Sequence, residues 1–235
     1  MWNPAIQLLK TRFRVIAPDL IGYGRTDSWP ADHAFSLDEE VRLIAPLIRN
    51  AQAPAHVVAH SYGGAVALRL AVSHPALIRS LTLVEPVAFY LLRALDEREA
   101  FAEVDAVRQK YMTRMDANDA DGAMRLFTGY WSGTDSWAAM DDSTRALMRK
   151  AAPKVLLDWE ATYAEGPSPE ALRQLTMPAR LLSGEVSPLP PRRILCRLAE
   201  LLPSSTRETV PGAGHLMPMT HTAWLAQSLA QKLDP

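Results

Sequence analysis

The stretch VVAHSYGGAVALRLAVSHP, residues 57–75, joins two patterns that are typical of different structures. Its first four residues form a short apolar run, which predicts a buried strand. The residues after Gly64 form an apolar run of helical length that Pro75 ends, which predicts a helix. Ser61 stands between the two runs. Because a sharp strand-to-helix turn lifts one side chain above the end of a sheet, Ser61 is a candidate nucleophile.

The same alternation of strand and helix occurs on both sides of this stretch. The predicted helices cover about residues 3–11, 36–52, 190–202 and 222–233, and the predicted strands cover 13–20, 55–60, 78–86, 179–184 and 206–212. Asn3 with Pro4 is typical of a helix start, and Ser36 with Glu39 fits a capping box. The alternation predicts an α/β fold with a mostly parallel sheet flanked by helices.

The strand pattern disappears from about residue 89 to residue 175, where amphipathic helices are predicted instead. We therefore divide the chain into an α/β core, made of residues 1–88 and 176–235, and a helical insert, residues 89–175.

Composition excludes several classes of protein. The chain has 235 residues, of which 48% are hydrophobic, and its formal net charge is −1, so nothing points to nucleic acid or to an anionic membrane surface. Its single cysteine excludes an internal disulfide framework and a cysteine zinc cluster. No apolar stretch is long enough to span a bilayer, and the first residues lack the pattern of a signal peptide, so we expect a cytoplasmic protein.

Three motifs resemble those of the α/β-hydrolases. VVAHSYGG resembles the nucleophile elbow, with Ala59 in place of the first glycine of G-x-S-x-G. APDLIGYGRTD resembles the loop after the family's fourth strand, and LPSSTRETVPGAGH resembles its last strand and histidine loop. The motifs occur in the family's order, and the resemblance covers nearly the whole chain from Phe13 on. It implies a serine hydrolase whose residues 89–175 form a helical cap.

The resemblance also implies that the first three strands of the family fold are absent from this sequence. The third of these strands lies between the fourth and the fifth in that fold, so its removal would leave two rows of unpaired backbone groups. We expect for this reason that the chain is a truncated form or starts at an internal methionine. The alternative is a variant in which the two remaining strands pair directly.

A serine hydroxyl needs an adjacent base, and the base in turn needs a carboxylate that orients it. The resemblance places the base at His215, after the last strand. The expected acid position holds Ser187, so two carboxylates are candidates. Glu85 ends a predicted strand 24 residues after Ser61, and Glu185 lies two residues before Ser187. We favour Glu85 because a carboxylate at that strand end can reach the same imidazole nitrogen.

The remaining site residues follow from the same resemblance. The backbone N–H of Tyr62 is the expected oxyanion donor, and a second donor normally comes from the loop after the family's third strand, for which this sequence has no motif. Tyr130, Trp131 and Trp137 of the insert are candidate pocket residues, as is Met217 beside the histidine loop.

Three other reactive side chains receive structural interpretations. His60 is expected to pack beneath the turn and to point away from the nucleophile. Asp19 is expected to shape the loop that follows it, and Cys196 is expected to pack within an amphipathic helix.

These residues predict a hydrolase that cleaves a carboxylic ester of a small to medium apolar substrate through an acyl-enzyme. A serine nucleophile argues against haloalkane dehalogenase and epoxide hydrolase chemistry, which use an aspartate. A catalytically silent ligand-binding protein and a carbon–carbon bond hydrolase are the alternatives. We expect no metal and no organic cofactor, a small-molecule substrate as partner, and we leave the oligomeric state open.

Overall fold

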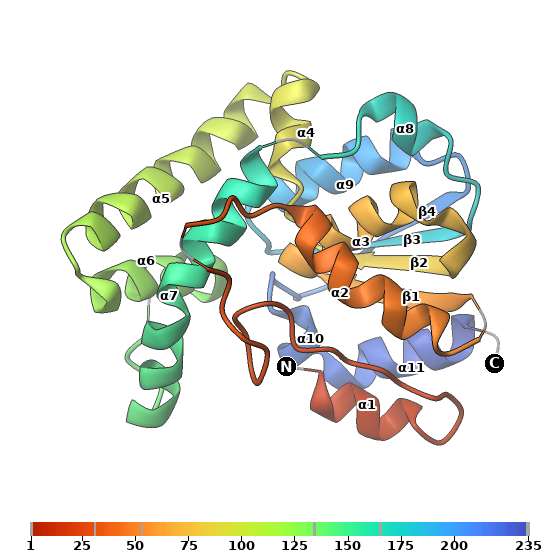
Figure 1. Cartoon of the computed structure of the whole chain (residues 1–235), viewed down its shortest axis with the longest axis horizontal. Coiled ribbons are helices and arrows are strands. Elements are labelled where there is room, and N and C mark those ends of the chain that lie inside the picture. The colour runs from red at the N-terminus through yellow and green to blue at the C-terminus, as the bar shows by residue number, and fades with distance from the viewer. Residues whose placement is uncertain (1, 31, 53, 134, 165, 234–235) are drawn as a thin grey trace.

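A parallel sheet of four strands forms the centre of the computed structural model, which describes residues 2–30, 32–52, 54–133, 135–164 and 166–233 (Figure 1). The strands are β1 (Ala55–His60), β2 (Ile78–Val84), β3 (Ala179–Gly184) and β4 (Ser205–Val210). They lie in the order β1-β2-β3-β4, and every neighbouring pair is parallel. The carboxyl ends of all four strands therefore meet at one edge of the sheet, where α/β proteins bind ligands.

Helices cover both faces of the sheet. One face carries α2 (Leu37–Arg49), α3 (Tyr62–Ser73), α8 (Pro169–Arg173) and α9 (Leu189–Leu201); the other carries α1 (Asn3–Leu9), α10 (Met217–Thr220) and α11 (Thr222–Lys232) (Figure 1). Successive strand residues point to opposite faces, so Leu181 lies in the core on the α3 side and Leu182 in the core on the α11 side. The α/β fold class is confirmed, with the helices on both faces that a buried parallel sheet needs.

A helical insert separates β2 from β3. It contains α4 (Phe89–Ala94), α5 (Arg98–Asp116), α6 (Ala120–Ser132) and α7 (Asp142–Tyr163), followed by α8. Helices α5, α6 and α7 stand to one side of the sheet, beyond the end at which β1 turns into α3 (Figure 1). None of the described helices is both long enough and apolar enough to cross a membrane.

The strand predicted at residues 13–20 does not form. This segment is irregular, and Val15 and Ile16 are 37% and 45% exposed. A strand needs a neighbour for its backbone groups, and among the described residues β1 pairs only with β2. An apolar run alone is therefore not sufficient for a strand here.

Two predicted helix caps also differ. The cap of α1 is Trp2, while Asn3 is already helical. Ser36 caps α2 with no side-chain hydrogen bond, and Glu39 pairs with Arg42 instead of closing a capping box. The helices form at these places nevertheless, because their apolar faces pack against the core.

Candidate active site

Ser61 lies between the last residue of β1 and the first of α3. Its backbone has φ 53° and ψ −123°, a left-handed conformation that is strained for a residue with a side chain. The surrounding chain holds this conformation, since the Ser61 N–H donates to the carbonyl of Val84 and its carbonyl accepts from Gly64 and Val87. Such a turn is the geometry of a nucleophile elbow.

The two glycines after the elbow differ in what surrounds them. A Cβ at Gly64 would lie 2.6 Å from Cβ and 2.9 Å from Cα of Pro86, so α3 approaches the chain after β2 closely at this point. A Cβ at Gly63 would meet nothing within 4 Å. A side chain is therefore excluded by close contact at Gly64 and not at Gly63.

His215 follows β4 in the loop at the same edge of the sheet. Its Nε2 lies 2.9 Å from Oγ of Ser61, and its side chain is buried. The Trp131 ring lies against the imidazole, with 4.0 Å between ring centroids. Burial lowers the pKa of His215 to about 3, so the imidazole is neutral at physiological pH and can accept a proton.

Glu85 is the carboxylate that the structure brings to His215. Its Oε2 lies 3.2 Å from Nδ1 of His215, and its Oε1 accepts a hydrogen bond of 2.7 Å from the Gly184 N–H. Glu85 is fully buried and has φ 49°, a second strained residue at a strand end. Burial raises the pKa of Glu85, and the Gly184 N–H and the side chain of Ser187 oppose that rise.

The alternative acid, Glu185, contacts Gly212 and not the imidazole of His215 among the described hydrogen bonds. It is exposed, and its Oε2 accepts a hydrogen bond from the Gly212 N–H. Ser187, at the position where the family's acid was expected, lies close enough to Glu85 to lower its pKa. Ser187 and the Glu85 carboxylate from the neighbouring strand thus lie side by side.

His60 is buried beneath the elbow, and it contacts His215. Its Nε2 lies 2.7 Å from the carbonyl oxygen of His215, with 4.8 Å between the two ring centroids. Burial lowers the pKa of His60 to about 3, so the ring is neutral and Nε2 carries the proton that the carbonyl accepts. Beyond the expected packing, His60 therefore holds the backbone of the histidine loop.

Tyr62 begins α3. In the first turn of a helix the backbone N–H groups have no intrahelical acceptor, and the Tyr62 N–H directly follows Ser61 in the chain. The side chain of Tyr62 points elsewhere and donates to Glu40. The structural interpretation of Asp19 fits, since its carboxylate accepts from the Arg25 N–H and its carbonyl from the Thr26 hydroxyl within its loop. Cys196 is only half-buried in α9, and its Sγ accepts a hydrogen bond from Arg207.

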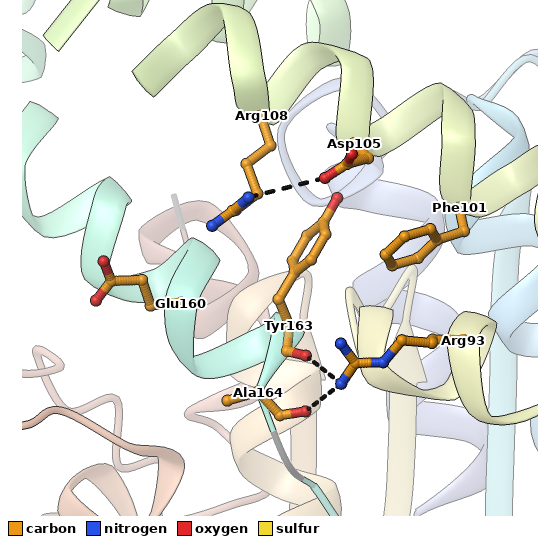
Figure 2. Close-up of a pocket in the computed structure, with 7 residues that line it drawn as sticks. All are labelled: Arg93, Phe101, Asp105, Arg108, Glu160, Tyr163 and Ala164. Atoms are coloured by element: carbon orange, nitrogen blue, oxygen red, sulfur yellow. Dashed lines mark hydrogen bonds and ion pairs between the residues drawn. The ribbon is translucent and has the colours of Figure 1, made fainter. Parts of the chain in front are cut away.

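One cavity lies on the surface of the insert, away from Ser61 (Figure 2). It has a volume of about 430 Å³ and is lined by Arg93, Phe101, Asp105, Arg108, Glu160, Tyr163 and Ala164. Its charged groups are largely engaged with the protein itself, since Arg93 donates to two backbone carbonyls and Arg108 pairs with Asp105 (Figure 2). Of the residues described, none lines both this cavity and the one beside Ser61.

The cavity beside Ser61 has a volume of about 160 Å³ and lies between the core and the insert. It is lined by Tyr23, Ser61, Tyr62, Val87, Phe89, Phe127, Trp131, Val155, Asp158, Trp159 and Thr162. Of the predicted pocket residues, Trp131 is part of this wall. Trp137 and Met217 are buried in the core instead, and the hydroxyl of Tyr130 donates to Glu103.

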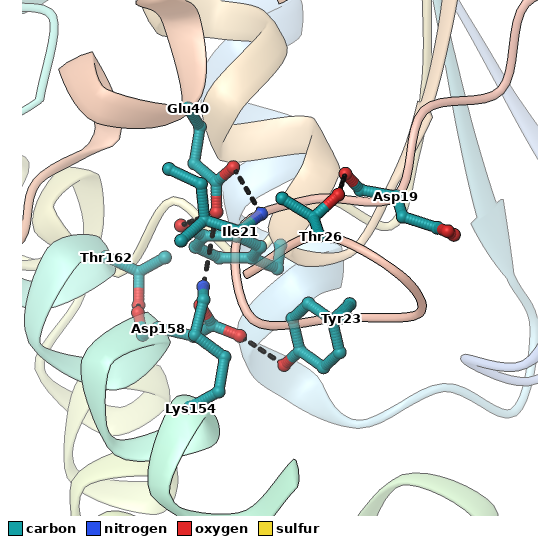
Figure 3. A network of polar contacts seen from close by, with 9 residues as sticks. Asp19, Ile21, Tyr23, Thr26, Glu40, Lys154, Asp158 and Thr162 are labelled. Atoms are coloured by element: carbon teal, nitrogen blue, oxygen red, sulfur yellow. Dashed lines mark hydrogen bonds and ion pairs between the residues drawn. The ribbon is translucent and has the colours of Figure 1, made fainter. Parts of the chain in front are cut away.

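A buried polar network includes three residues of this cavity's wall, Tyr23, Tyr62 and Asp158 (Figure 3). Lys154 of α7 pairs with Asp158 one turn later and with Glu40 of α2, 3.2 Å away. The hydroxyl of Tyr23 donates to Asp158, and that of Tyr62 donates to Glu40. Burial raises the pKa of Asp158 to about 6, although Lys154 lowers it.

No pattern in the sequence points to this network. Lys154 and Asp158 are spaced i, i+4 on a predicted amphipathic helix, which is the usual pattern of a solvent-exposed pair. Their partners, Tyr23 and Glu40, are more than 110 residues away in the sequence, and only folding brings them together. A search of the described residues also finds no group of three or more histidine, cysteine or acidic side chains that could hold a metal ion.

Comparison with known proteins agrees with this geometry. A family described as "alpha/beta hydrolase fold" matches residues 1–222. The chain is 43% identical over 79 residues to a probable lysophospholipase, BODYGUARD 2 of Arabidopsis thaliana, and 35% identical over 123 residues to lipase LipV of Mycobacterium tuberculosis. These matches cover 33% and 52% of this chain, and the chain spans only 17% and 42% of those two proteins. It is 27% identical to a 2-(acetamidomethylene)succinate hydrolase of Mesorhizobium japonicum, over 92% of this chain and 76% of that one.

Solved structures show the same fold at low sequence identity. MGS-M2, an α/β hydrolase from a Medee basin deep-sea metagenome, is 16% identical with a TM-score of 0.79, over all of this chain and 86% of that one. A thermophilic esterase of Thermogutta terrifontis is 21% identical with a TM-score of 0.72, and a meta-cleavage product hydrolase, CumD, is 19% identical with a TM-score of 0.68. Each of the last two matches covers 98% of this chain and 83% of the other.

Proposed function

Because the chain belongs to the α/β hydrolase fold family, we propose that it is a serine hydrolase that cleaves a carboxylic ester, or a related acyl bond, of a small to medium apolar substrate. One observation carries this proposal: a continuous hydrogen-bonded chain runs from Ser61 through His215 to Glu85. A nucleophile, a base and a group that orients the base are the three parts that acyl transfer by serine requires.

The distances support a role for each residue in this proposal. His215 takes the hydroxyl proton at Nε2 while Oγ of Ser61 attacks the acyl carbon, and Glu85 holds Nδ1–H and stabilises the imidazolium. The Tyr62 N–H donates to the oxygen that becomes negative. The imidazolium then gives its proton to the leaving alcohol. In the second half, a water loses its proton to Nε2 and attacks the acyl-enzyme, which releases the acid and restores Ser61.

The size and lining of the cavity support a short acyl group. Its 160 Å³ is below the roughly 300–1,000 Å³ of pockets for drug-sized ligands. Aromatic and aliphatic side chains form most of its wall, among them Phe89, Phe127 and Trp131. The proposed reaction uses only side chains and water, so it requires neither a metal nor an organic cofactor.

Two other functions use the same fold. A ligand-binding protein would need neither a serine in a strained elbow nor a base hydrogen-bonded to it, so the assembled chain favours catalysis. A carbon–carbon bond hydrolase, such as the meta-cleavage product hydrolase named above, is the second. An ester and a vinylogous diketone assayed side by side separate carbon–oxygen from carbon–carbon cleavage.

Covalent labelling with a fluorophosphonate tests the proposal. We expect one adduct on the intact protein by mass spectrometry, and none on Ser61→Ala. Ser73→Ala is the matched control, since the described contacts of the Ser73 hydroxyl are to backbone carbonyls of its own helix and to Nδ1 of the adjacent His74. An adduct that persists on Ser61→Ala, or a folded wild-type protein that takes no label, overturns the proposal.

A further inference from the structure

Among the described residues that line the cavity beside Ser61, Asp158 is the one charged residue, and it belongs to the polar network. Each oxygen of its carboxylate accepts one hydrogen bond from the protein: Oδ1 from Lys154 and Oδ2 from Tyr23 (Figure 3). A carboxylate oxygen can accept more than one hydrogen bond. Asp158 therefore presents unused acceptor capacity at the wall of the cavity.

The positive charge of Lys154 is engaged with the protein and is not part of the cavity wall. Its side chain is 5% exposed, and its ammonium pairs with both Glu40 and Asp158. The rings of Phe35, Tyr62 and Tyr23 lie 4.4, 4.6 and 5.1 Å from Nζ. Two carboxylates thus surround one ammonium, and of these three residues only Asp158 is part of the cavity wall.

The next residue of α7, Trp159, adds a hydrogen-bond donor. Trp159 lines the same cavity and is 4% exposed, and its indole N–H has no hydrogen-bond partner among the described residues. A buried donor without a partner costs free energy. Neighbouring atoms cover the indole nitrogen in this structure, so the ring must shift before an acceptor on a ligand in the cavity can remove that cost. Acceptor capacity and an unpaired donor thus belong to consecutive residues on the wall of one cavity.

We propose that Asp158 and Trp159 recognise an uncharged group on the acyl part of the substrate that both donates and accepts hydrogen bonds, such as a carboxamide, and that Asp158 rejects acyl groups ending in a carboxylate. The N–H of the group donates to Asp158, and its carbonyl accepts from the indole of Trp159. A carboxylate in the same place has no proton to donate and brings a like charge against Asp158 in a buried cavity. This inference rests on the proposed hydrolase function and names its substrate class.

Three p-nitrophenyl esters of equal length test the inference. Their acyl groups are glutaramate, which ends in a carboxamide, glutarate, which ends in a carboxylate, and 5-methylhexanoate, the apolar isostere. Rates at pH 7.5 are corrected for those of Ser61→Ala, which removes spontaneous cyclisation of the esters from the comparison. We expect kcat/KM for glutaramate to exceed that for glutarate by about tenfold or more, as the loss of a hydrogen bond to a charged group implies.

Variants assign this preference to the two residues. Asp158→Asn keeps the size of the side chain and removes its charge, so the glutaramate-to-glutarate ratio falls by about tenfold. Trp159→Phe removes the indole N–H and lowers the glutaramate-to-5-methylhexanoate ratio. Glu160→Gln on the same helix is the matched control, because Glu160 is exposed and lies outside this cavity. It leaves all three rates unchanged.

The outcomes separate this inference from the proposed function. Fluorophosphonate labelling of Ser61 without discrimination among the esters overturns the acyl recognition and leaves the hydrolase intact. Absence of labelling on folded protein overturns both. An unchanged ester ratio in Asp158→Asn overturns the role of Asp158. If Asp158→Asn does not fold, two other measurements decide. Equal kcat/KM values of the wild-type protein for glutaramate and glutarate, or an unchanged glutaramate-to-5-methylhexanoate ratio in Trp159→Phe, overturn the inference.

Discussion

Replacing Gly64 by alanine tests whether the close approach of α3 to the chain after β2 assembles the site. The added Cβ would lie 2.6 Å from Cβ and 2.9 Å from the backbone Cα of Pro86, so one of the two segments must shift. Pro86 lies between Glu85, which contacts His215, and Val87, whose N–H donates to the Ser61 carbonyl. The shift therefore reaches both the acid and the elbow.

Gly63→Ala provides the reference for the magnitude. Both glycines lie in the first turn of α3, and both gain roughly 0.5–1 kcal/mol of helix preference when alanine replaces them. Because both variants have this gain, it cancels in the difference between their free energies of unfolding. A Cβ at Gly63 meets nothing within 4 Å, so Gly63→Ala adds no contact of its own. The difference isolates the contact with Pro86, which we expect to cost about 1–3 kcal/mol as overpacking of a buried site.

Urea unfolding and labelling measure the two consequences. We expect Gly64→Ala to have a free energy of unfolding about 1–3 kcal/mol below that of Gly63→Ala. We also expect a slower rate of fluorophosphonate labelling at Ser61, while Gly63→Ala keeps the wild-type rate. Equal stability and equal labelling of the two variants would refute the claim that contact with Pro86 sets the geometry of the elbow.

Three further predictions concern charge. Glu85→Gln should lower kcat by about 10³-fold or more, because it removes the carboxylate that orients His215. The kcat of Glu185→Gln should stay within about twofold of the wild-type value. Ester kinetics measure both values, and a larger loss of kcat in the Glu185 variant would reverse the assignment. Burial lowers the pKa of His215, so the base stays neutral below pH 6.5 and the acid limb of kcat/KM should lie below that value. The unfolded chain binds the proton of this histidine near pH 6.5 and the folded chain does not, so stability should fall as the pH drops below 6.5; an acid limb at or above pH 6.5 contradicts this reasoning. Lys154→Met should destabilise by about 3–5 kcal/mol in urea unfolding, because it leaves two buried carboxylates without their cation, while Arg98→Ala, in an exposed ion pair, should cause no measurable change.

Local pattern was enough to predict most of the fold. The run AHVVAH predicts β1 at residues 55–60, and ARLLSG predicts β3 at residues 179–184, with the observed bounds. Both runs are apolar and bounded by turn residues, and both find a neighbouring strand. The run at residues 13–20 has a similar composition, yet it stays irregular because the described residues offer it no partner. Strand formation depends on a neighbour as well as on the segment itself.

The sequence by itself determined the parts of the site that a local rule governs. A serine between a strand and a helix must stand at the carboxyl edge of a parallel sheet, and a histidine after the last strand must return to that edge. Only the tertiary structure shows that Glu85 lies within hydrogen-bond distance of Nδ1 of His215 while Glu185 contacts Gly212, because no local pattern states which side chain points to that nitrogen. The tertiary structure alone also shows how Asp158, Lys154 and their distant partners contact one another. Buried charges are paired by contacts between segments that are far apart in the chain, and such contacts produce no periodic pattern in the sequence.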